Sequence, residues 1–158
     1  MAQKQLHIIH ITEDFSDKNF GVTKAMEEII DATSHLFRHS IVTVNNMTDT
    51  KTMTDVEVHA AEQKLYGEVW KYSPDILTIL KKINGSNKKV VYHIHGIWMA
   101  PQLIAATYGV SKGIPVVLSP HNMLCNWLWK RNTMHNLKNS IYWGLNVSIG
   151  RDHVVKRP

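Results

Sequence analysis

Short apolar runs alternate with amphipathic segments along most of the chain. The apolar runs are typical of buried strands and lie at residues 6–11, 40–44, 90–95 and 114–118, with a shorter edge strand expected at 56–58. Because strands that alternate with helices form parallel sheets through right-handed crossovers, the pattern predicts an α/β fold. We expect a Rossmann-like parallel sheet, with helices on both faces, in a single domain.

The segments between these runs carry helix signals. After a polar turn at Thr12–Gly21, apolar residues recur at helical spacing between 22 and 30 and define one buried face. Ser73 followed by proline is a typical helix start, and Gly85 is expected near the end of that helix. A third helix is expected from about Ala100 to Lys112.

Composition narrows the class of protein. The chain has 158 residues, of which 44% are hydrophobic and 20% charged, and its single cysteine, Cys125, favours a reducing compartment. Its amino-terminal residues lack the apolar core of a signal peptide, and no apolar run approaches the ~20 residues that span a bilayer. The sequence therefore predicts a cytoplasmic protein. The formal net charge is +5, but the basic residues are scattered, so we do not expect a nucleic-acid partner.

Histidines are frequent in the predicted strands. His93 and His95 are two residues apart on one strand, so their side chains point to the same face. That spacing is compatible with metal binding, but a site needs a third protein ligand, and none stands at a diagnostic spacing. His7 and His10 are expected on opposite faces of their strand. We therefore predict no metal and interpret His93 and His95 as a buried pair or as the lining of a cleft.

Two strands end in residues suited to ligand binding. The strand at 90–95 is followed by Gly96, and the strand at 114–118 is followed by Ser119, Pro120, His121 and Asn122. In open α/β sheets, ligands bind at the carboxyl ends of the strands. His121 at such an end is suited to donate a hydrogen bond to a sugar hydroxyl or to carry a proton near neutral pH.

The turn before the first helix contains one glycine, Gly21. A phosphate resting on the helix amino terminus and an ordinary βα turn are both compatible with it.

In combination and in order, these motifs resemble the amino-terminal half of family 4 retaining glycosyltransferases, which have the GT-B fold. The matching segments are residues 7–11, 21–26, 93–98 and 113–124, followed by Trp127, residues 130–132 and residues 141–143. The resemblance implies transfer of a sugar from a nucleotide sugar to a polysaccharide or a lipid-linked glycan. It implies no cofactor other than this donor substrate.

The resemblance also assigns roles to individual residues. It implies that His121 contacts the transferred sugar near the reaction centre and that His95 and Gly96 line the acceptor cleft. In the family, a pair of glycines in the first βα turn approaches the donor diphosphate. Here only Gly21 remains, after Phe20. Asn122 stands where the family usually has glycine, and asparagine tolerates a left-handed backbone better than most residues.

The family builds its active site between two domains, and the second domain holds the nucleotide sugar. We expect residues 1–143 to form the acceptor-side domain and residues 144–158 to be a divergent basic tail, too short for a domain. The chain is then a fragment, a truncated reading frame or half of a split enzyme, inactive without a complementary domain. A non-catalytic binding or partner module is the alternative. A dinucleotide-binding enzyme is less favoured, because no Gly-x-Gly-x-x-Gly follows the first strand.

The segment Asn126–Trp143 interleaves aromatic and basic residues, namely Trp127, Trp129, Tyr142 and Trp143 with Lys130, Arg131 and Lys138. This composition suits peripheral contact with the inner face of a membrane that carries anionic lipid. Packing of a helix against the sheet or against another domain is the alternative.

Overall fold

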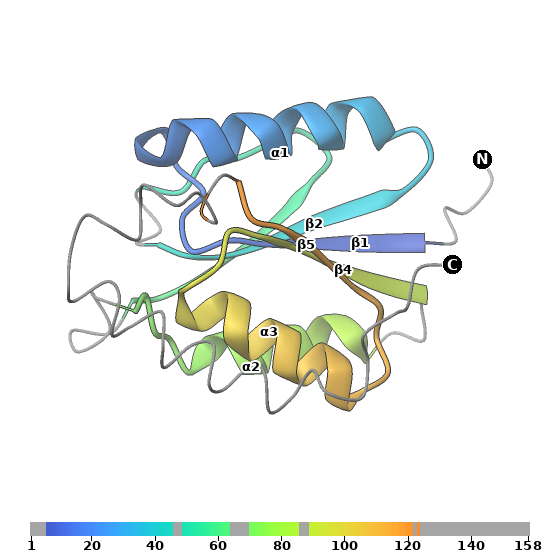
Figure 1. Cartoon of the computed structure of the whole chain (residues 1–158). Coiled ribbons are helices and arrows are strands. Elements are labelled where there is room, and N and C mark those ends of the chain that lie inside the picture. Colours follow the sequence, from blue (N-terminus) through green and yellow to red (C-terminus); the bar gives the residue numbers. More distant parts are fainter. Residues whose placement is uncertain (1–5, 46–48, 64–69, 86–88, 122, 124–158) are drawn as a thin grey trace. The chain divides into compact units, whose positions relative to one another are not determined.

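The computed structural model describes residues 6–45, 49–63, 70–85, 89–121 and 123, which form one twisted parallel sheet between helices (Figure 1). The five strands are β1 (Leu6–Ile11), β2 (Arg38–Val44), β3 (Glu57–Ala61), β4 (Lys89–His95) and β5 (Val116–Ser119). Their spatial order is β3-β2-β1-β4-β5, and all neighbouring strands run parallel. The predicted fold class, an α/β Rossmann-like sheet with helices on both faces, is confirmed.

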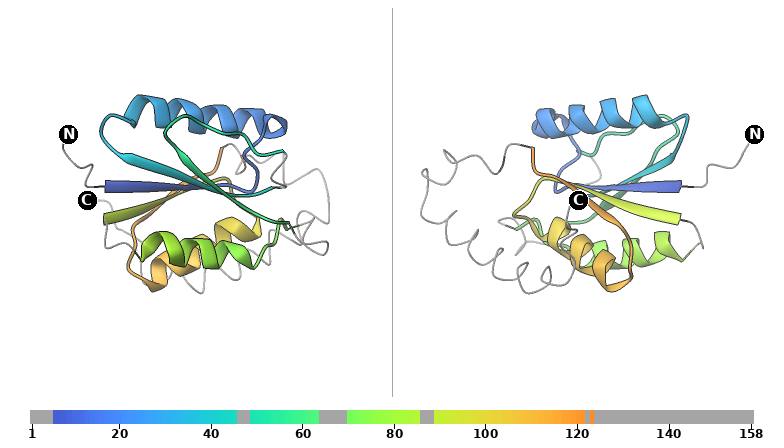
Figure 2. Two further views of the ribbon diagram at one scale, coloured as in Figure 1. Left: turned by 180° about the vertical axis from the view of Figure 1, so that it is seen from behind. Right: turned by 45° about the vertical axis from the view of Figure 1, so that its right-hand side comes forward.

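Helices cover the two faces of the sheet unequally. Helix α1 (Phe20–Thr33) lies on one face, and α2 (Asp75–Asn84) and α3 (Ala100–Ser111) lie on the other, as three views show (Figure 2). A short 3-10 helix, η1 (Asp17–Asn19), precedes α1. Since β1 is flanked by β2 and β4, the chain order reverses at β1, which is where open α/β sheets form ligand sites.

The two faces of the sheet have different chemistry. Strand residues that face α2 and α3 are aliphatic or aromatic, and they form the larger hydrophobic core, which includes Ile9, Val42, Tyr92, Leu80 and Ala105. A smaller apolar cluster beneath α1 contains Phe15, Val22, Met26, Ile30 and Ile41. On the face beneath α1, the central strands also carry polar side chains.

Most element predictions are close to the observed bounds. The strand expected at residues 6–11 is β1, and the short edge strand expected at 56–58 is the longer β3 at the sheet edge. Helix α2 begins one residue later than its expected Pro74 start, although Ser73 Oγ does accept a hydrogen bond from the Asp75 N–H at 3.3 Å. Gly85 ends that helix as predicted.

The prediction that Gly21 lies in the turn before the first helix is wrong. Helix α1 begins at Phe20, so Gly21 occupies its first turn. The polar residues Asp17–Asn19 form their own 3-10 turn, because Ser16 Oγ accepts a hydrogen bond from the Lys18 N–H at 3.2 Å and starts the helical path early. Gly21 is therefore a helical residue with open space around its Cα.

The chain divides into two compact units, residues 1–121 and 122–158. Every helix and strand named above belongs to the first unit. Apart from Met123, the second unit lies outside the described residues, and so do Asn122, the proposed tail at 144–158 and the aromatic and basic segment Asn126–Trp143. Within the described ranges, no helix is both long and apolar enough to cross a membrane.

Candidate functional site

Three strands, β1, β2 and β4, and the turn after β5 bring five histidines together on the α1 side of the sheet. In the parallel pairing of β1 with β4, His10 stands directly beside His93. Alternation along β4 then puts His95 on the same face as His93, two residues further toward the carboxyl edge. His39 of β2 and His121 after β5 complete the group, which we call the histidine cluster: His10, His39, His93, His95 and His121.

Four members of the cluster form a continuous hydrogen-bonded chain. The Nδ1 atom of His39 lies 3.0 Å from Nε2 of His10. His10 Nδ1 lies 2.9 Å from His95 Nε2, and His95 Nδ1 lies 2.9 Å from His121 Nε2. The chain therefore runs across the sheet from β2 to the turn after β5.

The Thr33 end of this hydrogen-bonded chain determines which nitrogen of each imidazole carries the proton. The Thr33 hydroxyl donates to the Ile29 carbonyl at 2.6 Å, so its oxygen must accept from His39 Nε2–H at 3.2 Å. A neutral His39 then has an accepting Nδ1, and the same reasoning passes from ring to ring. Each of the four imidazoles carries its proton on Nε2, and the chain ends in an accepting Nδ1 on His121.

Burial favours the neutral form of the two central rings, those of His10 and His95. His10 and His95 are completely buried, and His39 is nearly so. Burial, and then the charge that neighbouring histidines would carry, lowers the pKa of His10 to about 3 and that of His95 to about 2. Burial also lowers the pKa values of the partly exposed His93 and His121. At neutral pH these four histidines therefore offer uncharged imidazoles.

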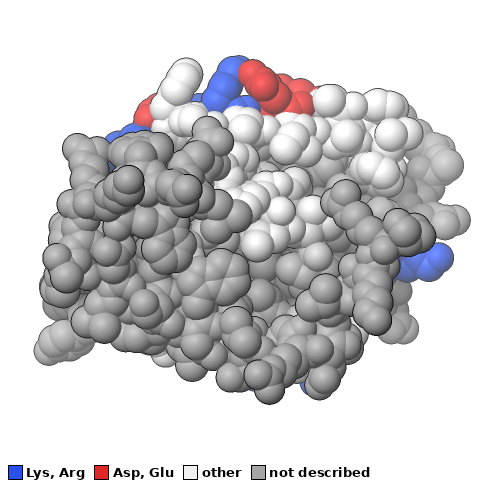
Figure 3. Space-filling model, in the orientation of Figure 1, with Lys and Arg blue, Asp and Glu red and all other residues white. Residues whose placement is uncertain are grey.

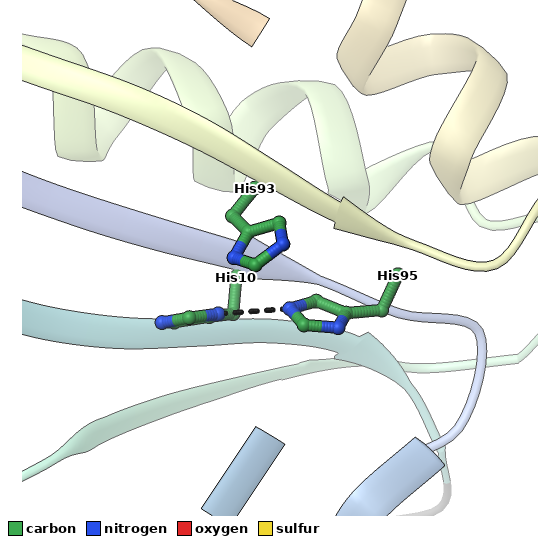
Figure 4. Close-up of side chains that lie close together, drawn as sticks. All are labelled: His10, His93 and His95. Carbon is green, nitrogen blue, oxygen red and sulfur yellow. Dashed lines mark hydrogen bonds between the residues drawn. The ribbon is translucent and has the colours of Figure 1, made fainter. Parts of the chain in front are cut away.

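The fifth ring, His93, branches from the chain. Its Nε2 lies 2.8 Å from the hydroxyl oxygen of Ser119, and its ring centroid is 4.1 Å from that of His95. Figure 4 shows His93 above His10 and His95, with the three rings close together. One ring nitrogen from each of these three residues lies within 4.8 Å of the others.

The turns at the carboxyl edge have unusual backbone conformations. Gly96 has a φ of 80°, and its N–H donates to the Ser119 carbonyl at 2.8 Å, which extends the pairing of β4 and β5. Trp98 and His121 also have positive φ values, 77° and 46°. Such conformations are costly for residues with a side chain and concentrate at functional sites.

A polar contact with α3 also holds the carboxyl edge, from the face of the sheet opposite the histidine cluster. The buried Gln102 of α3 donates from Nε2 to the main-chain carbonyl of His95 at 3.1 Å and to the Glu13 carboxylate. Glu13 follows β1, so this contact ties the turns after β1 and β4 to helix α3. The position of His95 is thus fixed from its backbone as well as from its ring.

The structure brings three of the five predicted site residues together. His95, Gly96 and His121 adjoin at the carboxyl edge, as expected from the ends of β4 and β5. Gly21 lies in the first turn of α1, beside the exposed Phe20. Asn122 lies outside the described residues, and the left-handed residue of that turn is His121 itself.

Sequence reasoning missed His10 and His39. It correctly put His7 and His10 on opposite faces, since His7 pairs with Ser40 and His10 with the cluster. No spacing within one strand links His10 to His93, because their proximity depends on the register between β1 and β4. The usable signal was that the predicted strands at 6–11 and 90–95 both contain histidines and that His39 comes directly before the predicted strand at 40–44.

Two cavities among the described residues lie away from the carboxyl edge, although the first reaches His39 at the other end of the hydrogen-bonded chain. One, of about 430 Å³, is at the amino ends of β1 and β2 and is lined by His7, Asp31, His35, Arg38 and His39, among others. The second, of about 470 Å³, is lined by residues from the ends of α2 and α3, including Asn84 and Tyr108. We favour the carboxyl edge as the site because the hydrogen-bonded rings of His95 and His121 are there, with the positive-φ residues Trp98 and His121; Asp55, beside the first cavity, also has a positive φ but no such ring pair.

Among the described residues, charged side chains near α1 form local ion pairs. Lys51 contacts Asp17 at 3.1 Å and Glu27 at 2.6 Å, and Lys18 contacts Asp49 at 2.9 Å. In Figure 3, basic and acidic side chains adjoin at the top of the view, above an uncharged part of the described surface. On the described part of this face, charges of both signs alternate and form no one-sided basic stripe.

Comparison of the chain with protein-family models, with curated proteins and with solved structures finds no match in any of the three.

Proposed function

We propose that this chain is the acceptor-side half of a glycosyltransferase and binds the sugar end of a polysaccharide or lipid-linked glycan. The observation that carries the proposal is the meeting of His95, Gly96 and His121 at the carboxyl edge of the sheet. This edge is where α/β sheets bind ligands, and the motif order that resembles family 4 glycosyltransferases assigns the same residues to the sugar site.

The proton order of the histidine chain gives His121 a definite role. Its Nε2–H is used toward His95, so Nδ1 accepts hydrogen bonds. Because the ring is neutral at physiological pH, Nδ1 is able to accept the proton of a sugar hydroxyl. The left-handed backbone at His121 fixes where this acceptor stands, and positioning of that kind is a large part of glycosyl-transfer catalysis.

In this proposal, the groups that hold the nucleotide sugar lie outside the described residues. The chain would contribute the acceptor cleft, and a complementary domain would contribute the donor site. Catalysis would consist mainly of positioning the acceptor and stabilising the leaving diphosphate. The nucleotide sugar is a substrate here, so no cofactor is proposed.

Binding of acceptor sugars tests the proposal directly. We expect saturation-transfer NMR to detect binding of oligosaccharides from a mixed glycan panel to the purified chain. His121→Ala should weaken that binding by roughly 5- to 30-fold, as expected for the loss of one or two hydrogen bonds. His35→Ala, an exposed histidine of the helix α1–β2 connection, is the matched control and should leave binding unchanged. Equal binding by all three proteins would contradict the proposal.

Turnover separates a glycosyltransferase half from the alternative, a binding module without chemistry. We expect no sugar transfer when the chain alone is supplied with nucleotide sugars. Co-expression with a donor-binding domain encoded beside this chain should restore transfer, and His121→Ala should then lower kcat by roughly 100-fold. Glycan binding without transfer in every such combination would favour the non-catalytic module.

A further inference from the structure

We propose that His10, His93 and His95 form a binding site for a divalent transition metal, with Zn²⁺ the expected ion. The evidence for this site does not rest on the proposed sugar-binding function, and the site is built from three imidazoles on two adjacent central strands (Figure 4). It leaves one coordination position for a water or a ligand oxygen, as three-histidine zinc sites do.

One of the three pairs of ligand nitrogens already stands near the separation that a metal requires. The nitrogens of His10 and His95 that face each other are 2.9 Å apart. Two imidazole nitrogens on one tetrahedral zinc ion stand about 3.3 Å apart, given Zn–N bonds of about 2.0–2.1 Å. Opening this contact by a few tenths of an ångström therefore makes room for the ion. The third ring supplies its Nδ1, since Nε2 of His93 already contacts Ser119.

In each of the three histidines, the ring nitrogen that would not bind the metal already has a hydrogen-bond partner. Metal-binding histidines nearly always use the second ring nitrogen in a hydrogen bond that orients the ring. Here His10 Nε2 pairs with His39, His95 Nδ1 pairs with His121, and His93 Nε2 pairs with Ser119. Histidines that served only to pack the core would not need a hydrogen-bond partner at the second nitrogen of every ring.

The ligand chemistry favours zinc over magnesium or calcium. The group contains three imidazole nitrogens and no carboxylate, and imidazole suits Zn²⁺, Cu²⁺, Ni²⁺ and Fe²⁺, whereas Mg²⁺ and Ca²⁺ prefer oxygen. Burial favours neutral rings, which are the form that binds metal. Three neutral ligands leave the full double charge of the ion, so the fourth position would attract an anionic or hydroxyl oxygen.

Metal binding would reverse part of the proton order. Without metal, His95 Nε2–H donates to His10, and His121 Nε2–H donates to His95. With metal, His95 must present the Nε2 lone pair to the ion, so its proton moves to Nδ1 and is donated to His121. His121 then carries its proton on Nδ1. The metal would thus convert the outward-facing nitrogen of His121 from a hydrogen-bond acceptor into a donor, with no net release of protons.

Zinc titration of the chelator-treated protein is the first test. We expect isothermal titration calorimetry to give one tight Zn²⁺ site per chain, and substitution with Co²⁺ to give the visible absorption of a tetrahedral nitrogen site. His93→Asn is the informative variant, because His93 is only half-buried and asparagine retains a polar group beside Ser119. It should weaken zinc affinity by more than 100-fold while circular dichroism remains that of the folded protein.

Control variants separate this site from the other histidines. His59→Ala removes a half-buried histidine of β3 outside the cluster and should leave affinity unchanged. His39→Gln alters only an outer partner and should weaken binding by about 10- to 100-fold. If His93→Asn fails to fold, the cobalt spectrum of the wild-type protein and the His39→Gln comparison still decide the question.

Nitrogen-15 NMR of the imidazoles supplies a readout that adventitious metal would not produce. We expect Nε2–H tautomers at His95 and His121 in the metal-free protein and Nδ1–H tautomers at both after zinc is added. The proposal is overturned if the chelator-treated protein takes up no zinc, if His93→Asn binds with wild-type affinity, or if zinc leaves both tautomers unchanged. None of these results depends on whether the chain binds sugar.

Discussion

Thr33 is a single side chain at the end of α1 that sets the direction of protons across the sheet. Because its hydroxyl proton goes to Ile29, its oxygen accepts from His39, and every following ring takes the same tautomer. Thr33→Val keeps the shape of the side chain and removes that oxygen. We expect the four imidazoles of the metal-free protein to become a mixture of tautomers by nitrogen-15 NMR, and the free energy of unfolding to fall by about 1 kcal/mol.

The matched control is Thr33→Ser, which keeps the hydroxyl and should retain the Nε2–H order. A uniform Nε2–H order in Thr33→Val would mean that another contact of His39 sets the direction.

Single residues also show where sequence reasoning reached its limit. His95, Gly96 and His121 were predictable because each follows from its place at a strand end. His10 was not, since 83 positions separate it from His93 and only the register of β1 with β4 makes them neighbours. Within a strand, spacing fixes the face of a side chain, but between strands the pairing of backbones decides which side chains meet.

At the scale of elements, Gly109 allows α3 to lie close to the sheet. A Cβ added at Gly109 would lie 2.9 Å from Val116 Cγ2 and 3.0 Å from Tyr92 Cδ2. Gly21 has nothing within 4 Å of the corresponding position, although it too is helical. We therefore expect Gly109→Ala to lower the free energy of unfolding by about 1–3 kcal/mol, despite the better helix propensity of alanine.

Gly21→Ala should instead raise the free energy of unfolding by about 0.5–1 kcal/mol, because it gains helix propensity without a clash. Urea unfolding of both variants checks the pair. Equal effects of the two substitutions would show that α3 is free to move away from β4.

Tyr92 of β4 provides a pH-dependent probe of the same contact. Burial raises the pKa of its phenol to about 12, an effect opposed by the hydrogen bond from Asn84 and assisted by Tyr108. Because the folded-state pKa lies above the unfolded value of about 10, Tyr92 stabilises the fold below pH 10, and this contribution is lost as the pH rises through 12. Ultraviolet titration of tyrosine ionisation should show one late phase near pH 12.

That late phase should be absent in Tyr92→Phe. Above pH 10 the free energy of unfolding of the wild type should fall relative to that of Tyr92→Phe. Ionisation of all tyrosines in a single phase near pH 10 would contradict the buried position of the phenol.

Helices and strands were predictable where the hydrophobic pattern and the helix-capping residues indicated the same bounds. The apolar runs of β1, β2, β4 and β5 contain enough β-branched residues to mark strands without any tertiary information. The start of α1 was placed too late, because the polar residues before it adopt a 3-10 turn and the exposed Phe20 hides the helical period. Residues at helix ends are decided by local hydrogen bonds, and these are only weakly encoded in hydrophobic periodicity.

At the scale of the whole molecule, one face of the sheet carries the larger apolar core and the other face carries the histidine cluster. The face toward α2 and α3 carries the continuous apolar core, which the sequence pattern predicts well. The face toward α1 carries five histidines, which no pattern of hydrophobicity predicts, because their neutrality depends on burial and on one another. A fold with a self-sufficient core on one face is able to tolerate a costly polar cluster on the other.

The outer edge of the sheet gives the last prediction for the molecule as a whole. Strand β5 is the terminal strand on its side among the described residues, and its Val117 and Leu118 are about half exposed. An edge strand with exposed aliphatic side chains pairs readily with another chain, so we expect self-association to increase with protein concentration. Sedimentation velocity should show this association, and Leu118→Lys should abolish most of it.

The matched control is Leu36→Lys, since Leu36 has nearly the same exposed fraction, 54% against 51%, but lies between α1 and β2. It should associate like the wild type, because lysine there changes the charge of the molecule equally without touching the β5 edge. If both lysine variants reduce association to the same extent, repulsion between like-charged molecules is the cause. If Leu118→Lys alone does so, the β5 edge is the surface at which a second chain, including a complementary domain, would add to the sheet.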